Sequence, residues 1–99
     1  MTATPELLDA VRNYLDITYV DDAGDAKLSG IIARGMAYLD RVAGEPLDYS
    51  VEGIARQLLF DFCRYVRAGA FEDFARNYQS ELIGLQIDCE VSRHGTIDE

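Results

Sequence analysis

Positively charged residues are scarce in this sequence. Nine lysine and arginine residues stand against 18 acidic residues, so the formal net charge is −9 at pH 7. Binding to a nucleic-acid backbone or to an anionic membrane surface depends on Lys and Arg. The charge balance therefore argues against both kinds of partner, and we expect no sequence-specific nucleic-acid binding and no membrane docking.

Cysteine and histidine are also rare, and long apolar runs are absent from the sequence. Cys63 and Cys89 are too few for a disulfide framework. No apolar stretch approaches the roughly twenty residues of a membrane span, and we expect no signal peptide. We therefore expect a cytosolic protein with reduced thiols. The single histidine, His94, lies in a polar C-terminal stretch, where we expect a solvated side chain because a zinc site or triad needs rigid partners.

Apolar residues at helical spacing predict a small all-α, four-helix domain formed by the whole chain, residues 1–99. The expected helices cover residues 4–16, 25–43, 50–68 and 70–82. Thr4 and Pro5 mark the first start, and Asp48 or Ser50 caps the third helix. Gly35 lies inside the apolar stripe of the second helix, which indicates close approach of another helix.

The second and third helices should supply the core. We expect five of their residues to be buried where the two helices meet: Leu28, Ile32, Leu39, Leu58 and Phe62.

The C-terminal segment follows a different period. Residues 85–91 alternate between apolar and polar side chains, which is typical of a strand. No other segment has this pattern, so residues 84–99 are predicted to be an extended or flexible tail that is mobile or pairs with another chain. Leu85 and Ile87 are accordingly candidate interface residues.

No catalytic or metal-binding pattern in this sequence is complete. Counted from Asp21, an EF-hand loop would need Gly at the sixth position and Glu at the twelfth, but Ala26 and Ile32 stand there. Cys63 has arginines nearby that could lower its pKa, but the commoner role for such a residue is a small core hydrophobe. We expect no enzyme activity, no cofactor and no metal.

One aromatic residue lies among arginines. On a helix, Phe60 falls opposite the apolar stripe and beside Arg56, Arg64 and Arg67. It is either a surface ring covered by arginine stems or the centre of an interface, and the enrichment of aromatics and Arg in hot spots favours the interface. An acidic surface of a second copy would complement it, and such heterologous contacts can close into rings.

The order of several sequence blocks resembles a known family. "GIIARGMAYL" at 30–39 and "ARQLLFDFCRYVR" at 55–67, followed by "FEDFARNY" at 71–78, are similar to blocks of the head–tail connector (adaptor) proteins of tailed bacteriophages and prophages. That family is also described as DNA-packaging proteins. The resemblance runs over about residues 7–87, and "RAG" at 67–69 departs from it.

The resemblance implies a structural role without enzymatic activity or cofactor. A connector subunit forms a ring with copies of itself beneath the portal protein, extends the DNA channel and carries the tail-side stopper or tail completion protein. It would be found at the head–tail junction of the virion, and in the host cytoplasm during assembly.

Two other functions remain open. A small acidic regulator that binds a host protein, such as a DNA mimic, would suit the charge, although the acids here are scattered among arginines. A weaker candidate is an enzyme that depends on Cys63.

Overall fold

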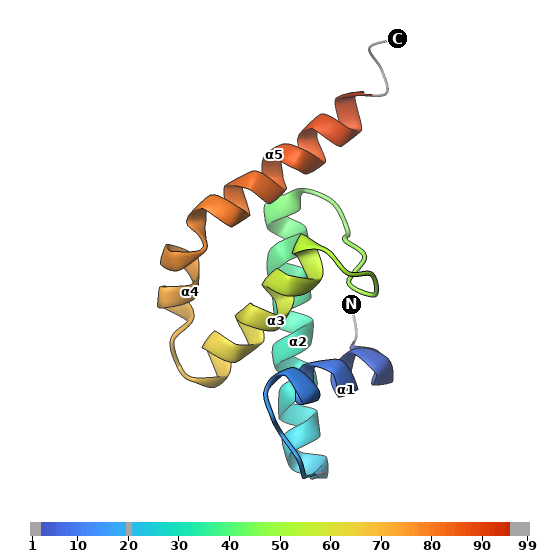
Figure 1. Cartoon of the computed structure of the whole chain (residues 1–99), viewed down its shortest axis with the longest axis vertical. Coiled ribbons are helices and arrows are strands. Elements are labelled where there is room, and N and C mark those ends of the chain that lie inside the picture. Colours follow the sequence, from blue (N-terminus) through green and yellow to red (C-terminus); the bar gives the residue numbers. More distant parts are fainter. Residues whose placement is uncertain (1–2, 20, 96–99) are drawn as a thin grey trace.

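The structure is a computed structural model that describes residues 3–19 and 21–95. Five helices and no strand are present among these residues (Figure 1). They are α1 (Pro5–Tyr14), α2 (Asp22–Ala43), α3 (Ile54–Arg67), α4 (Phe71–Asn77) and α5 (Gln79–Gly95). The all-α prediction is confirmed, whereas the prediction of four helices is wrong. The helix expected over 70–82 is interrupted at Tyr78, and a fifth helix continues from there.

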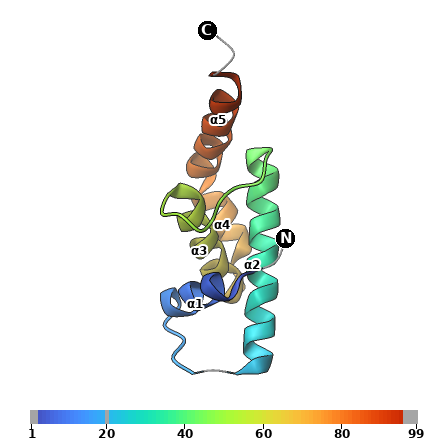
Figure 2. The same cartoon turned by 90° about the vertical axis from the view of Figure 1, so that its right-hand side faces the viewer.

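The helices are arranged around α2, the longest of them. α3 runs back along α2, α1 crosses α2 near its beginning, and α5 crosses it near its end (Figures 1 and 2). The short α4 connects α3 to α5. The molecule is elongated, with a longest extent of 52 Å.

The predicted extended segment is helical as far as residue 95, and residues 96–99 lie outside the described part. Its alternating pattern arises from two helical stripes that overlap in the sequence. Leu82, Leu85 and Cys89 recur every three or four residues and are buried. The second stripe, which contains Ile87 and Val91, points away from the core. Over residues 85–91, a strand with a period of two residues and a helix with two apolar stripes of 3.6-residue period would place apolar residues at the same positions.

Helix boundaries follow local chemistry. Thr4 accepts a hydrogen bond from the Leu7 N–H (3.2 Å) and Pro5 occupies the first turn of α1, as expected. α2 ends at Gly44, whose φ of 79° is left-handed. The predicted cap of α3 is wrong, because that helix begins only at Ile54. Asp48 instead accepts hydrogen bonds from Ser50 in the preceding turn.

The core lies where α2 and α3 cross, as predicted. All five residues expected there, Leu28, Ile32, Leu39, Leu58 and Phe62, are buried. Gly35 permits the close approach, because a β-carbon at this position would lie 2.7 Å from Leu59 Cδ1 and 2.8 Å from Phe62 Cδ1. Leu59 and Phe62 are themselves buried, and the close packing of a protein interior resists the shift that an added β-carbon would require.

Replacing Gly35 with alanine should therefore destabilise the protein. The gain of up to about 1 kcal/mol in helix propensity is outweighed by overpacking, which typically costs about 1–3 kcal/mol. Gly30→Ala, in the same helix, is the matched control: its nearest neighbour would be Arg34 Nη1 at 3.5 Å, an ordinary contact. Urea denaturation should give a lower free energy of unfolding for Gly35→Ala and a higher one for Gly30→Ala. Stabilisation by both substitutions would contradict the tight crossing.

Candidate functional site

Four of the six residues predicted as an interface lie along α3, on the side that α1 partly covers, and the other two lie on α5. We call Arg56, Phe60, Arg64 and Arg67, together with Tyr14 of α1, the arginine face. Arg64 and Arg67 are exposed, whereas Phe60 and Arg56 are half-buried. The face is therefore most accessible near the C-terminal end of α3.

Phe60 is packed inside the single chain more than its helical position suggested. Its ring centroid lies 5.4 Å from that of Tyr14, and the guanidinium carbon of Arg56 lies 4.8 Å from the Phe60 centroid. The sequence could not reveal this arrangement, because the covering ring comes from a different helix. A charge at position 60 would therefore disturb the packing between α1 and α3 as well as the surface.

Arg56 has a structural task of its own. Its Nη1 donates a hydrogen bond to the Tyr49 carbonyl oxygen at 2.9 Å, and its Nε lies 3.7 Å from a Glu52 carboxylate oxygen. The side chain thus ties the α2–α3 connection to α3. Among the four predicted residues of α3, Arg64 and Arg67 remain the better candidates for contact with a partner.

Beneath the arginine face lies a buried carboxylate that the sequence analysis missed. Asp61 is 5% exposed and accepts hydrogen bonds from the Tyr14 hydroxyl (2.5 Å) and the Gln57 amide nitrogen (3.3 Å). Arg64 lies 3.6 Å from the same carboxylate. The group joins α1 to α3 and fixes Tyr14 beside Phe60. Its position in "FDF", between two aromatic residues, was the available signal.

Asp61 also affects two tyrosines. The hydrogen bond to Asp61, followed by burial, raises the pKa of Tyr14. Burial and then Asp61 raise the pKa of Tyr78 to about 12, from an ordinary value of 10.0. A negative neighbour and a poorly hydrated site both disfavour the phenolate.

The protein should consequently lose stability as pH rises from about 10 to about 12. The unfolded chain, in which Tyr78 has its ordinary pKa, releases the proton first, so alkaline solution favours unfolding. Urea midpoints measured across this range should fall, and fall less in Tyr78→Phe, which has no phenol at this position. The loss is reduced and not abolished, because Tyr14 still titrates. An identical decline in both proteins would contradict the assignment to Tyr78.

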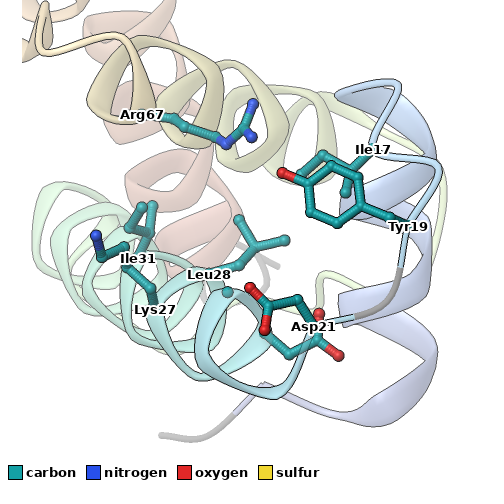
Figure 3. A pocket seen from close by; sticks show the side chains of 9 residues that line it. Ile17, Tyr19, Asp21, Lys27, Leu28, Ile31 and Arg67 are labelled. Carbon is teal, nitrogen blue, oxygen red and sulfur yellow. The ribbon is translucent and has the colours of Figure 1, made fainter.

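A pocket of about 400 Å³ adjoins the arginine face at the start of α2. Figure 3 shows Arg67 of α3 facing this pocket from one side, and Tyr19 and Asp21 of the α1–α2 connection facing it from the other. Its apolar lining is made of Ile17, Leu28 and Ile31, and Lys27 adds a second cation. We call this hollow the Arg67 pocket.

A second surface lies on α5. Ile83, Ile87 and Val91 follow one another at intervals of four residues and are 47%, 54% and 61% exposed. We call this row the α5 stripe. Leu85, predicted to share an interface with Ile87, lies on the opposite side of the helix and is buried in the core of the chain. Ile83 and Val91, which the sequence analysis did not single out, accompany Ile87 instead.

The other candidate residues are placed as follows. Cys63 is buried, and burial raises its pKa to about 12, which does not favour a reactive thiolate. The EF-hand count began at Asp21, but α2 begins at Asp22, and Asp25 within this helix is paired with Arg12 (3.1 Å). For His94 the structure describes only the backbone, which belongs to α5, so its predicted solvation lies outside the described features.

Neither a metal-binding cluster nor a membrane-spanning helix occurs among the described residues. Among the described side chains, those of residues 3–19 and 21–92, no cluster of three or more His, Cys, Asp or Glu is arranged to hold a metal ion. None of the helices in the described part of the chain has the length and apolar character needed to cross a membrane.

No protein-family model, curated protein or solved structure matched this chain.

Proposed function

We propose that this chain is a structural subunit of a head–tail connector, which assembles as a ring on the portal of a phage head and joins the DNA-filled head to the tail. The observation that carries the proposal is the presence of two accessible surfaces of different chemistry on one small chain. The α5 stripe is apolar, and the arginine face is aromatic and basic. A subunit of a ring needs two such surfaces, because each copy contacts a neighbour on either side.

The positions of these surfaces support the proposal. Arg67 of the arginine face lines the Arg67 pocket, which lies at the beginning of α2. The helix that carries the stripe, α5, crosses the other end of α2 (Figures 1 and 2). Surfaces at opposite ends of an elongated molecule favour contacts between different faces. Repeating such a contact generates a ring when the rotation closes.

The net charge of −9 also suits the proposed place in the virion. A channel lined by basic residues would bind the DNA that has to pass through it, because neutralising phosphates releases counterions and is favourable. An acidic subunit leaves the DNA free to move. The sequence blocks that resemble head–tail connectors lie largely on α2, α3 and α4, which supply much of the core.

The alternative is a small acidic regulator that mimics DNA. Such a protein would display its carboxylates freely in rows. Here Arg12 pairs with Asp9 and Asp25, and Arg76 pairs with Asp73, so part of the acidic charge of α1, α2 and α4 is neutralised within the chain. This pairing supports the connector over the mimic.

The proposal predicts that the purified protein binds heads that carry the portal protein of the same genome. In sedimentation experiments it should pellet with these heads and remain in solution with heads that lack the portal. Electron micrographs should show an added layer at the portal vertex. Binding that is independent of the portal, or no binding at a protein concentration of about 100 µM, well above the micromolar dissociation constants of moderate complexes, would contradict the connector function.

A further inference from the structure

The α5 stripe is a continuous row and not a set of isolated exposed residues. Its three members stand one above another on the helix at intervals of four residues, and each exposes about half of its surface or more. Scattered apolar residues on a surface are ordinary, whereas a contiguous row indicates a contact site. The core-facing side of α5 is already occupied by Leu82, Leu85 and Cys89, so the stripe is free to meet another molecule.

The edges of the stripe define the charge of its partner. Glu81, Asp88 and Glu90 flank the row and are exposed, and no basic residue occurs between positions 77 and 92. A helix that carries an apolar row between carboxylates is complementary to an apolar hollow edged with cations. A partner surface that presents mainly carboxylates at the contact, or a nucleic acid, would be repelled.

The same chain supplies a surface of that description in the Arg67 pocket. Ile17, Leu28 and Ile31 give it an apolar lining, and Lys27 and Arg67 place two cations at it (Figure 3). The carboxylate of Asp25 is occupied by Arg12, at 3.1 and 3.3 Å, which leaves Asp21 as the opposing charge in the pocket. Arg64, whose side chain is 52% exposed, extends the basic edge along α3.

We propose that the α5 stripe of one copy docks in the Arg67 pocket of a second copy, with Ile87 entering the apolar hollow and Asp88 facing Arg67. This inference rests on the proposed ring function and names the two surfaces that form the subunit contact. The pocket lies at the beginning of α2, and α5, which carries the stripe, crosses the other end of that helix (Figure 1), so the contact joins different copies. Because it uses two different faces, every added copy leaves one stripe and one pocket open until a ring closes.

A contact built on one short helical row is small, so a single pair of copies should associate weakly. Interfaces that bury less than about 1,200 Å² are typical of weak and transient complexes. Ring closure on a portal would strengthen the assembly, since the copies already bound hold their open surfaces close together. The experiment must therefore detect weak association.

The test uses two variants, each of which blocks one surface. Ile87→Asp places a charge in the stripe and leaves the pocket intact, while Arg67→Glu reverses the charge at the pocket and leaves the stripe intact. Both positions are exposed, so the melting temperatures of the two variants should stay close to that of the unmodified protein. Val51→Asp is the matched control, because Val51 is 56% exposed against 54% for Ile87 and lies outside both surfaces.

Sedimentation velocity and NMR shift titrations at concentrations up to about 1 mM, where millimolar contacts are visible, should give a distinctive pattern. The unmodified protein and Val51→Asp should associate increasingly with concentration, and each blocked variant alone should stay monomeric. An equimolar mixture of the two blocked variants should form dimers and nothing larger, because only one stripe and one matching pocket remain intact.

Charge exchange tests the pairing of Asp88 with Arg67. Asp88→Arg should weaken association by about tenfold or more, since like charges then face each other. The double variant Ile87→Asp/Arg67→Asp has a blocked stripe and an acidic pocket. Mixed with Asp88→Arg, it should restore the binding, because the new arginine at position 88 then faces the new aspartate at position 67. If Ile87→Ser weakens association as Ile87→Asp does, the effect comes from the lost apolar contact and supports the proposal.

Three results would overturn the contact. The first is that the unmodified protein does not associate at about 1 mM. The second is that Arg67→Glu associates on its own, which would indicate pairing between two stripes. The third is that the mixture of the two blocked variants forms no dimer. Failure of the contact is distinct from failure of the function. If the protein binds portal-bearing heads but does not show this association pattern, the connector function is supported and the proposed contact is wrong. If it shows the pattern but does not bind the portal, the contact is supported and the connector function is wrong.

Discussion

The close approach of α2 and α3 at Gly35 is the constraint on which the rest of the structure depends. A β-carbon at this position would lie within 3 Å of Leu59 and Phe62, so the absence of a side chain sets the distance between the two helices that supply most of the buried core. With the two helices in contact, α1 and α5 cross α2 at its two ends. The crossing therefore also separates the Arg67 pocket from the α5 stripe.

Two polar groups position the segments that adjoin the α2–α3 crossing, which are α1 and the α2–α3 connection. Asp61 is buried beneath the arginine face and holds Tyr14 of α1 by a 2.5 Å hydrogen bond. Tyr49, in the connection between α2 and α3, donates to Asp40 at 2.7 Å, and burial followed by Asp40 raises its pKa. Buried polar groups are costly unless they are satisfied, so these contacts specify where α1 and the connection lie. They keep the exposed surface of α3 in one arrangement.

The sequence predicted the α2–α3 core because a 3.6-residue period and a glycine in the apolar stripe have direct physical meanings. It misread residues 85–91, where one buried and one exposed stripe on a helix mimic the alternation of a strand. The packing of Phe60 on Tyr14 was beyond reach, since it depends on how two separate helices meet. Six residues were predicted as an interface. Arg64, Arg67 and Ile87 are exposed and belong to the surfaces proposed above, whereas Arg56 and Phe60 are half-buried and Leu85 is buried. The partners of Ile87 on the stripe emerged only once the segment was seen to be helical.

The most direct test of the central claim is photo-crosslinking from position 87. A photoreactive phenylalanine analogue replaces Ile87, and the protein is irradiated at high concentration as an equimolar mixture of isotope-labelled and unlabelled copies. Mixed-isotope crosslinks identify contacts between copies by mass spectrometry. The account predicts that these crosslinks fall on the α1–α2 connection, the first turns of α2 and the end of α3, around Tyr19, Lys27 and Arg67. Crosslinks confined to α5 of the second copy, or the absence of mixed-isotope products, would contradict it.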